Sequence, residues 1–544
     1  MSDWTSGYVA DVDYTHDFFH EMTPAMLALS ATSRGQKHGL NQKRLSYCEL
    51  GCGQGFTANL LAAANPHIDF HAMDFMPGHI AGARELAVEG GLDNVHFYER
   101  SFADFEEETA LPKQFDVIAL HGVMSWVSKE NQDLIVDFIG RRLAAGGMVY
   151  ISYNVLAAWA AAMPLRRVLL DHAAQSSSPT EDRVDEALAF AAKLEATGAK
   201  FFTINPSASS RLGSAKNMSR KYLAHELFNA DWTPFHFGDL AAHLDQAKLS
   251  FVGSSCMLDH VADISLTPQQ GELLAAESDP VQRENLRDVM VNEQFRSDLF
   301  VKGPRQHTER SAIGAWFETP LARMQRYNGG VLKLRWRQGE IALDHAQYAP
   351  ILDVLVAGPA TVRSLLDQGV FGRMTWGEIS RLLTILVGSG ILSPCLPLEG
   401  RAAREARCPA FNLALCKRAE DSDTLRFLAS PVTGGGVEFD RFEQLFLLAL
   451  SEGKTDPNQW ADMVWGILSA QGQRVRHEGR MLARDAENLA VLQVRATNFA
   501  ARRLPLCITL GLCLPLQEGF AVPDLQQDAD LDAAELPRQI RGVA

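Results

Sequence analysis

Three glycines, Gly51, Gly53 and Gly55, stand between a short apolar run and a helix-forming run. Glycine is used where the backbone turns tightly or where a ligand touches the main chain. A strand, a glycine turn and a helix form the first unit of a nucleotide-binding α/β sheet. A dinucleotide fold has G-x-G-x-x-G, but Phe56 occupies the place of its third glycine. Glu49 lies two residues before the first glycine, and this spacing predicts binding of S-adenosylmethionine (AdoMet), whose ammonium favours an acidic neighbour.

The elements around this turn follow a strand–helix alternation. We predict five strands, at 46–50, 69–74, 95–99, 115–120 and 147–154. Alternation of this kind requires a parallel sheet covered by helices on both faces. Two later apolar runs, 248–253 and 297–303, would complete a Rossmann-like sheet of seven strands. The alternative is a glycine-rich turn in another kind of α/β protein, and the convergence of polar residues at the strand ends argues against it.

Ligands of such sheets lie beyond the carboxyl ends of the strands. Asp74 ends the second strand 23 residues after the first glycine, Gly51, where an open α/β sheet places an acidic residue on the ribose hydroxyls. A helix cap is the alternative role for this carboxylate. Ser101 and Phe102 would frame the adenine, and His121 would border the sulfonium. The expected cofactor-binding residues are Glu49, Gly51, Gly53, Asp74, Phe75, Ser101, Phe102, His121 and Gly122.

The composition, with 47% hydrophobic and 22% charged residues, is that of a folded protein. The 51 Lys and Arg residues against 66 Asp and Glu residues give a net charge of −15. A nucleic-acid partner is therefore not expected, because phosphate binding needs clustered Lys and Arg. Eight cysteines without paired C-x-x-C clusters predict reduced thiols in a cytoplasmic protein. No secretion signal is recognised, and the longest apolar run, 504–516, is too short to span a bilayer.

Signatures of other chemistries are absent. The sequence contains no H-E-x-x-H, G-x-S-x-G or P-loop motif. Its histidines and cysteines show no ligand spacing, so we expect no metal. Methylases of bases and glutamine amides carry Asn/Asp-Pro-Pro-Tyr/Phe after the fourth strand. Here that place is taken by His121-Gly122-Val123-Met124, which excludes their substrates.

A chain of 544 residues is too long for one core and predicts about three domains. Residues 1–304 would form the cofactor domain, with a helical insertion at about 157–235 that overhangs the active site or forms a homodimer interface. We expect a winged-helix-like domain at 305–400 and a mostly helical domain at 401–544. The winged-helix prediction rests on a hairpin followed by helices at 361–366 and 375–387 and a short strand.

DNA binding by this middle domain is not favoured. Its second helix carries only Glu378 and Arg381 as charged residues, whereas DNA-reading helices crowd Arg, Lys, Asn or Gln at such positions. A capping box, Thr375 with Glu378, opens that helix.

With these motifs in hand, the sequence resembles bacterial class I methyltransferases that carry a methyltransferase regulatory domain, best known from rickettsial outer-membrane-protein lysine methyltransferases. The resemblance rests on the stretches 14–19, 49–55, 120–128, 151–154, 222–229, 232–235 and 292–303. It implies methyl transfer from AdoMet, with S-adenosyl-L-homocysteine as the product. It also implies a regulatory-type segment at about 217–303, a helical dimerisation part and, by analogy, protein lysine as the acceptor.

A lysine acceptor must lose its proton, which a desolvated aromatic pocket promotes. We expect Tyr14, Trp126 and Tyr153 to form that pocket, with a tyrosine hydroxyl orienting the amine. For each of the three, a role as a core aromatic is the alternative. The negative net charge would attract basic protein segments. Two other functions stay open, a small-molecule or natural-product methyltransferase and a non-catalytic AdoMet-binding scaffold.

Overall fold

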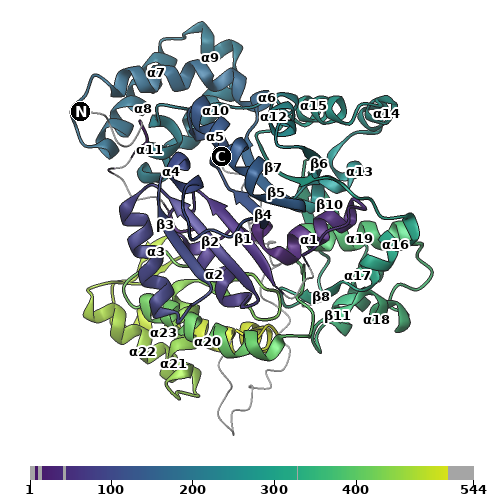
Figure 1. Cartoon of the computed structure of the whole chain (residues 1–544). Coiled ribbons are helices and arrows are strands. Elements are labelled where there is room, and N and C mark those ends of the chain that lie inside the picture. The colour runs from purple at the N-terminus through teal and green to yellow at the C-terminus, as the bar shows by residue number, and fades with distance from the viewer. Residues whose placement is uncertain are drawn as a thin grey trace.

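The computed structural model describes residues 7–9, 11, 15–40, 44–327, 329–337 and 339–512. At its centre lies a sheet of seven strands in the order β3-β2-β1-β4-β5-β7-β6 (Figure 1). The strands are β1 (Leu45–Leu50), β2 (Ile68–Asp74), β3 (Val95–Glu99), β4 (Phe115–Leu120), β5 (Leu143–Asn154), β6 (Leu249–Ser254) and β7 (Phe295–Lys302). Strands β1 to β5 pair in parallel, and β7 runs antiparallel to both β5 and β6. The predicted seven-stranded Rossmann-like sheet is confirmed, as a mixed sheet.

Successive residues of each strand bury into opposite faces of the sheet. On β1, Tyr47 joins the core on the face covered by α2 (Phe56–Ala64), and Cys48 joins the core under α5 (Lys129–Arg142). The other helices of this layered unit are α1 (Pro24–Ser33), α3 (Pro77–Glu89), α4 (Phe102–Glu106), α12 (Phe237–Asp245), α13 (Ala262–Ser265), α14 (Pro268–Ala276) and α15 (Pro280–Val291). Short 3-10 helices lie at His20–Met22, Met124–Trp126 and Met257–His260. Both faces of the sheet are thus covered.

A bundle of helices is inserted between β5 and α12. Its helices are α6 (Leu156–Trp159), a 3-10 turn (Ala160–Ala162), α7 (Met163–Ala173), α8 (Thr180–Ala196), α9 (Lys200–Ile204), α10 (Pro206–Ala215) and α11 (Arg220–Phe228). This bundle encloses a core of its own, which includes Leu165, Val184 and Leu212. Its polar and alanine-rich sequence therefore folds as a helical insertion at one end of the sheet (Figure 1).

The next segment combines helices with two small sheets. Its helices are α16 (Glu309–Phe317), α17 (His345–Val354), α18 (Val362–Asp367) and α19 (Trp376–Gly388). Its strands are β8 (Pro320–Arg323), β9 (Lys333–Trp336), β10 (Gly339–Ala342), β11 (Ala360–Thr361) and β12 (Leu392–Pro394). The β9–β10 hairpin, the two helices and the Thr375–Glu378 capping box are confirmed. The central strand β8 of the sheet β11-β8-β12 precedes the helices, so these elements do not by themselves establish a winged helix.

The last described segment is mostly helical. It contains α20 (Arg401–Arg418), α21 (Arg441–Ser451), α22 (Pro457–Ala470), α23 (Asp485–Asn498), a π-helical turn (Phe499–Arg503) and α24 (Leu504–Thr509), with the hairpin strands β13 (Phe427–Ala429), β14 (Gly436–Glu438), β15 (Arg476–His477) and β16 (Arg480–Met481). No helix among the described residues is long and apolar enough to cross a membrane.

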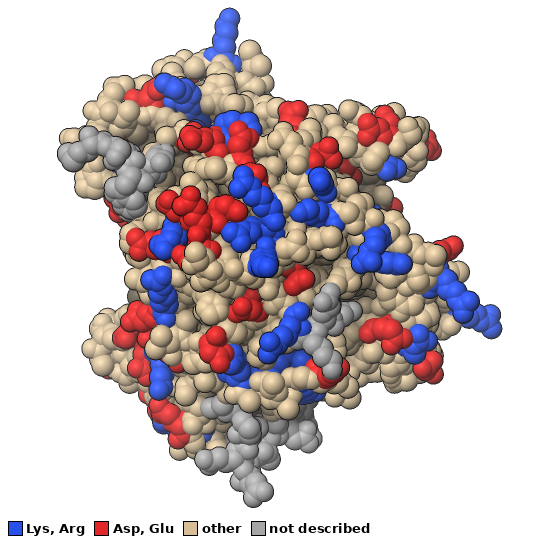
Figure 2. All heavy atoms as spheres, in the orientation of Figure 1, with Lys and Arg blue, Asp and Glu red and all other residues tan. Residues whose placement is uncertain are grey.

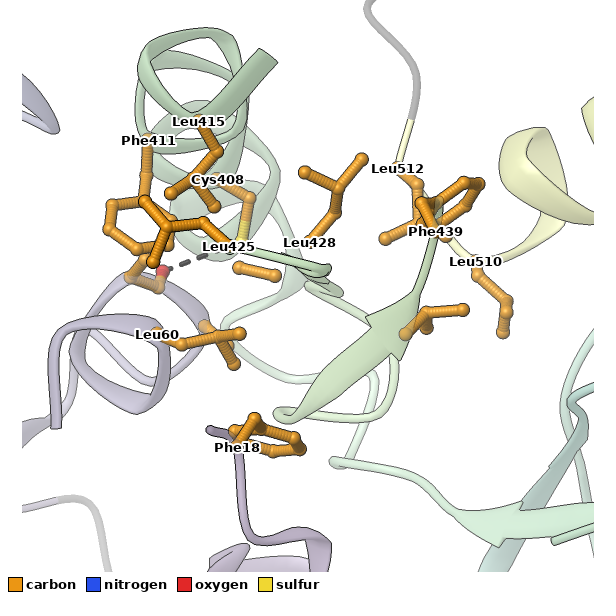
Figure 3. Packing of buried hydrophobic residues seen from close by; sticks show 14 of the residues in the cluster. Phe18, Leu60, Cys408, Phe411, Leu415, Leu425, Leu428, Phe439, Leu510 and Leu512 are labelled. Carbon is orange, nitrogen blue, oxygen red and sulfur yellow. Dashed lines mark hydrogen bonds between the residues drawn. The ribbon is translucent and has the colours of Figure 1, made fainter. Parts of the chain in front are cut away.

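These C-terminal helices share a hydrophobic core with the central sheet. Figure 3 shows Leu60 of α2 between Phe411 and Phe18, with Leu428 in the same cluster. The Cys408 thiol donates to the carbonyl oxygen of Ala63 at 3.4 Å. The C-terminal segment therefore forms an outer layer over α2, and the central sheet and the helical segment bury apolar surface together.

Candidate active site

The glycine turn after β1 combines a left-handed backbone with close packing against neighbouring side chains. Gly51, Gly53 and Gly55 have φ angles of 72°, 52° and 66°, which residues other than glycine rarely adopt. A Cβ on Gly51 would lie 2.6 Å from Cγ2 of Val123, and one on Gly55 would lie 2.5 Å from the Cβ of Ala83. Larger residues would therefore fill or distort this turn.

Glu49 is a buried carboxylate that lacks a full set of partners. Its residue is 5% exposed, and its Oε2 atom has no hydrogen-bond partner among the described residues. Burial, followed by the neighbouring charge of Asp74, raises the pKa of the Glu49 carboxyl to about 8. A buried charge without a partner is costly. The arrangement therefore fits a ligand cation, and the AdoMet ammonium is such a group.

Asp74 connects the end of β2 to the glycine turn. Its Oδ2 accepts from the Gly53 N–H at 2.9 Å, and its Oδ1 accepts from the Met76 N–H, also at 2.9 Å. The second bond lies just before α3, so part of the helix-capping alternative is realised. A carboxylate has about four lone-pair sites, so capacity for ribose hydroxyls is left. The next residue, Phe75, packs edge-on to Tyr8, with the ring centres 5.5 Å apart.

Ser101 and Phe102 lie where β3 passes into α4. The Ser101 hydroxyl caps that helix, since it accepts from the Asp104 N–H at 3.2 Å and donates to Oδ2 of Asp104 at 2.7 Å. Phe102 packs at the edge of the core beneath α5. The hydroxyl proton of Ser101 is thus donated to Asp104, whereas the ring of Phe102 is only partly buried.

His121 follows β4 and lies in an aromatic stack. Its ring is stacked on Phe19 with centres 3.5 Å apart, and its Nδ1 lies 2.8 Å from the Tyr150 hydroxyl. Burial lowers the pKa of His121 to about 3, so the imidazole is neutral. The following Gly122 N–H donates to Oγ of Ser152 at 2.8 Å. A neutral, oriented ring therefore stands at the carboxyl end of β4.

The three aromatic residues predicted for the acceptor pocket have different positions. Tyr14 lies outside the described residues. Trp126 is half-buried, and its ring centre lies 6.2 Å from that of Trp232. Tyr153 is fully buried, and its hydroxyl donates to Oδ2 of Asp298 at 2.6 Å. The contacts of Tyr153 therefore favour the alternative role as a core aromatic.

Two residues near His121 were not singled out for the site from the sequence. Phe19 falls within the stretch 14–19 that carries the family resemblance, and Tyr150 falls within the predicted strand at 147–154. Thr57 holds the Phe19 segment against α2, because its hydroxyl donates to the Asp17 carbonyl and accepts from the Phe19 N–H. Strand alternation separates Tyr150 from Tyr153. The position of Tyr150 beside His121 follows from the pairing of β4 with β5, in which Leu120 and Ile151 are partners, and no sequence motif indicates that register.

Comparison with known proteins agrees with this geometry. Residues 41–196 match the family described as a methyltransferase domain, and residues 219–302 match a predicted methyltransferase regulatory domain. The uncharacterized protein sll1526 of Synechocystis sp. is 40% identical over 509 residues, which cover 94% of this chain and 99% of that protein. The uncharacterized protein RP789 of Rickettsia prowazekii is 27% identical over 255 residues, 46% of this chain and 45% of that protein.

A solved structure extends the likeness to nearly the whole chain. PKMT2 from Rickettsia typhi, in complex with AdoHcy, aligns with a TM-score of 0.67 and 17% identity over 92% of this chain and 99% of that chain. At this identity the likeness is one of fold. The chain belongs to the class I methyltransferases that carry a methyltransferase regulatory domain. It is an AdoMet-dependent methyltransferase.

Proposed function

We propose that this enzyme methylates lysine side chains of a protein. The observation that carries the proposal is the extent of the likeness to PKMT2, a protein lysine methyltransferase, which includes the C-terminal half. That half shows no catalytic motif, yet it shares its core with the catalytic sheet. A small-molecule enzyme has no need of so large a non-catalytic surface, whereas a protein substrate has to be docked.

The cofactor would lie along the carboxyl ends of β1 to β4. Glu49 would hold the ammonium, Gly51 and Gly53 would touch the methionine and ribose part, and Asp74 would bind the ribose. Phe75, Ser101 and Phe102 would surround the adenine, and His121 and Gly122 would border the sulfonium. When bound, AdoMet supplies an activated methyl group. What the chain then contributes is mainly positioning, since the transfer is an in-line displacement.

The acceptor amine has to arrive neutral. Trp126 lies beside Trp232, which also packs edge-on against Trp159 at 5.2 Å. Aromatic walls disfavour the charged ammonium by desolvation. We assign Trp126, together with Tyr14, to the pocket walls, and the hydroxyl of Tyr150 to holding the neutral His121 ring. Tyr153 would act through Asp298 as a support.

Charge complementarity adds a weaker argument. The net charge of −15 would attract basic segments of a substrate protein. Figure 2 shows acidic and basic side chains interspersed over one face of the molecule, so no single-sign surface dominates this view.

The middle segment, residues 305–400, offers a second surface. In its helix α19, Arg381 is paired with Asp263 at 2.6 Å. We propose that residues 305–400 act as a winged-helix-like domain and contact a protein partner.

Transfer of labelled methyl groups tests the proposal. The full chain is incubated with methyl-labelled AdoMet and a lysate fractionated by size, and labelled bands are mapped by mass spectrometry. We expect label on lysine in a discrete protein band, and much weaker label at the same AdoMet concentration with Glu49→Gln as the cofactor-binding control. Label confined to the small-molecule fraction would identify a small-molecule methyltransferase instead. Binding of AdoMet without transfer to either fraction would indicate a scaffold.

A further inference from the structure

A cluster of three side chains lies on the outer strands of the sheet, away from the cofactor end. Asp69 and His71 stand two residues apart on β2 and therefore share a face. His96 on β3 is the register partner of His71. Nε2 of His71 lies 3.1 Å from one oxygen of Asp69, and Nε2 of His96 lies 3.0 Å from the other. Among the described residues, this is the one group of three or more such ligand atoms within 4.8 Å of one another.

We propose that Asp69, His71 and His96 bind one transition-metal ion, and that Zn²⁺ is the ion they fit. Two imidazoles and one carboxylate are the donor types that Zn²⁺ takes in proteins, and with three protein ligands the fourth position belongs to water. Zinc–ligand bonds of about 2.0–2.2 Å at tetrahedral geometry place ligand atoms about 3.3–3.6 Å apart. The separations of 3.0 and 3.1 Å run to the two different oxygens of Asp69, and one ligand atom from each of the three residues lies within 4.8 Å of the other two, so small side-chain rotations would bring three ligand atoms to these distances.

The surroundings of His71 supply the support that a metal ligand needs. Its side chain is 4% exposed, and its other ring nitrogen, Nδ1, lies 3.0 Å from the Tyr98 hydroxyl. A ligating histidine commonly donates this second N–H to a neighbouring acceptor, which fixes the tautomer and the ring. The hydroxyl of Tyr98 can accept in the metal-bound form and donate in the free form. The Tyr98 ring is also stacked on His71 at 5.9 Å.

The other two ligands leave the site accessible. The side chains of His96 and Asp69 are 45% and 51% exposed, so an ion can enter from solvent and keep a bound water. Strand β3 is the outermost strand on its side of the sheet, with β2 as its one neighbour. An ion held by β2 and β3 together would fasten this edge strand. Asp69 and His96 are the second residues of their strands and His71 is the middle residue of β2, whereas Asp74 ends β2, so the site is separate from that of the cofactor.

Metal titration of the full, untagged chain tests this site. We expect one Zn²⁺ per chain to bind by calorimetry, and Co²⁺ to give the visible absorption of a tetrahedral site. His96→Ala and Asp69→Asn should each weaken Zn²⁺ binding at least about tenfold. His477→Ala, at an exposed histidine of β15, is the matched control and should bind like the unchanged chain.

Stability measurements separate ligand loss from misfolding. Zn²⁺ should raise the melting temperature of the unchanged chain and of His477→Ala, because an ion that binds the folded state stabilises it. It should not raise that of His96→Ala, whose unfolding without metal should stay cooperative. Equal Zn²⁺ affinity in His96→Ala and the unchanged chain would overturn the proposal. So would an unchanged chain that binds no Zn²⁺, and Asp69 would then act only as a hydrogen-bond bridge between the two rings.

Discussion

Two buried carboxylates on the same sheet, Asp298 and Glu49, differ in how many hydrogen-bond partners they have. Asp298 on β7 is fully buried, and its oxygens accept from the Tyr153 hydroxyl at 2.6 Å and from the Arg296 guanidinium at 2.7 and 3.1 Å. Glu49 on β1 is also buried, but its Oε2 has no partner among the described residues. A buried charge is stable when it is paired and hydrogen-bonded. Asp298 is therefore fully paired within the fold, whereas the unpaired oxygen of Glu49 supports the proposal that this carboxylate meets a ligand.

The partners of Asp298 belong to a larger ionic group. Arg296 also binds Asp288 at 2.7 Å and Glu284 at 2.8 Å, both on α15, and its guanidinium lies 4.4 Å from the ring centre of Phe237. One cation thus connects β7, α15 and α12. These ionic and ring contacts of Arg296 fix the positions of β7, α15 and α12 relative to one another.

Replacing the shared cation should have the largest effect. Arg296→Met leaves the carboxylates of Asp298, Asp288 and Glu284 without their cation. Removing one partner of a buried ion pair costs about 3–5 kcal/mol, so we expect a loss of stability of this size, measured by denaturant unfolding.

The control for this change is a solvent-exposed ion pair. Arg167 pairs with Asp171 on the surface of α7, with side chains 75% and 55% exposed. Arg167→Met should change stability by no more than about 0.5 kcal/mol. Equal effects of the two substitutions would show that the buried group is not what holds β7 to α15.

Neutralising Glu49 should separate binding from stability. Glu49→Gln removes the charge that would meet the cofactor ammonium, and a hydrogen bond to a charged group is worth about 1.5–3 kcal/mol. We expect AdoMet affinity, measured by calorimetry, to fall about 10- to 100-fold, while the melting temperature of the ligand-free chain stays unchanged or rises. Glu478→Gln, at an exposed glutamate, is the control. Unchanged affinity in a folded Glu49→Gln variant would remove the ammonium assignment.

The two tyrosines of β5 test the difference between the buried ionic group around Asp298 and the site around His121. Tyr153→Phe takes one donor from Asp298 and should cost about 1–3 kcal/mol of stability, with turnover at saturating AdoMet retained. Tyr150→Phe frees the His121 ring and should lower turnover roughly tenfold through misplacement. Steady-state kinetics and thermal unfolding of both variants measure these effects. A turnover defect in Tyr153→Phe alone would reverse the two assignments.

Proton release on cofactor binding is the smallest expected effect. Burial raises the pKa of Glu49 to about 8, so at pH 7 the ligand-free carboxyl is mostly protonated. An ammonium ligand favours the carboxylate, so binding at pH 7 should release up to about one proton. Calorimetry in buffers of different ionisation enthalpy measures this number, and Glu49→Gln should abolish the contribution of Glu49.

The same raised pKa has a consequence for the ligand-free chain. A carboxyl whose pKa is higher when folded than when unfolded contributes stability below its unfolded value and loses it as the pH rises through the folded value. Stability should therefore fall between the usual glutamate pKa of 4.5 and about 8. The fall should be smaller in Glu49→Gln, and an identical pH profile in both proteins would contradict the raised pKa.

The local sequence determined the glycine turn and the strand–helix alternation of this protein. Gly51, Gly53 and Gly55 adopt the left-handed backbone that their spacing indicates, because only glycine enters that conformation without strain. Strand–helix alternation specified the five parallel strands β1 to β5, since parallel strands need crossovers and covered faces, and two later apolar runs indicated β6 and β7. These features depend on residues close together in the chain, so pattern and spacing are sufficient to predict them.

Long-range pairing was decided only by the tertiary structure. The register of β4 with β5 places Tyr150, and not Tyr153, beside His121, and the register of β2 with β3 brings His96 to His71. The C-terminal helices share a core with α2, and Arg296 meets carboxylates of α15. A one-residue shift in register moves every side chain of a strand to the other face. Composition and spacing do not contain that register, because it is set by packing between segments that are distant in the chain.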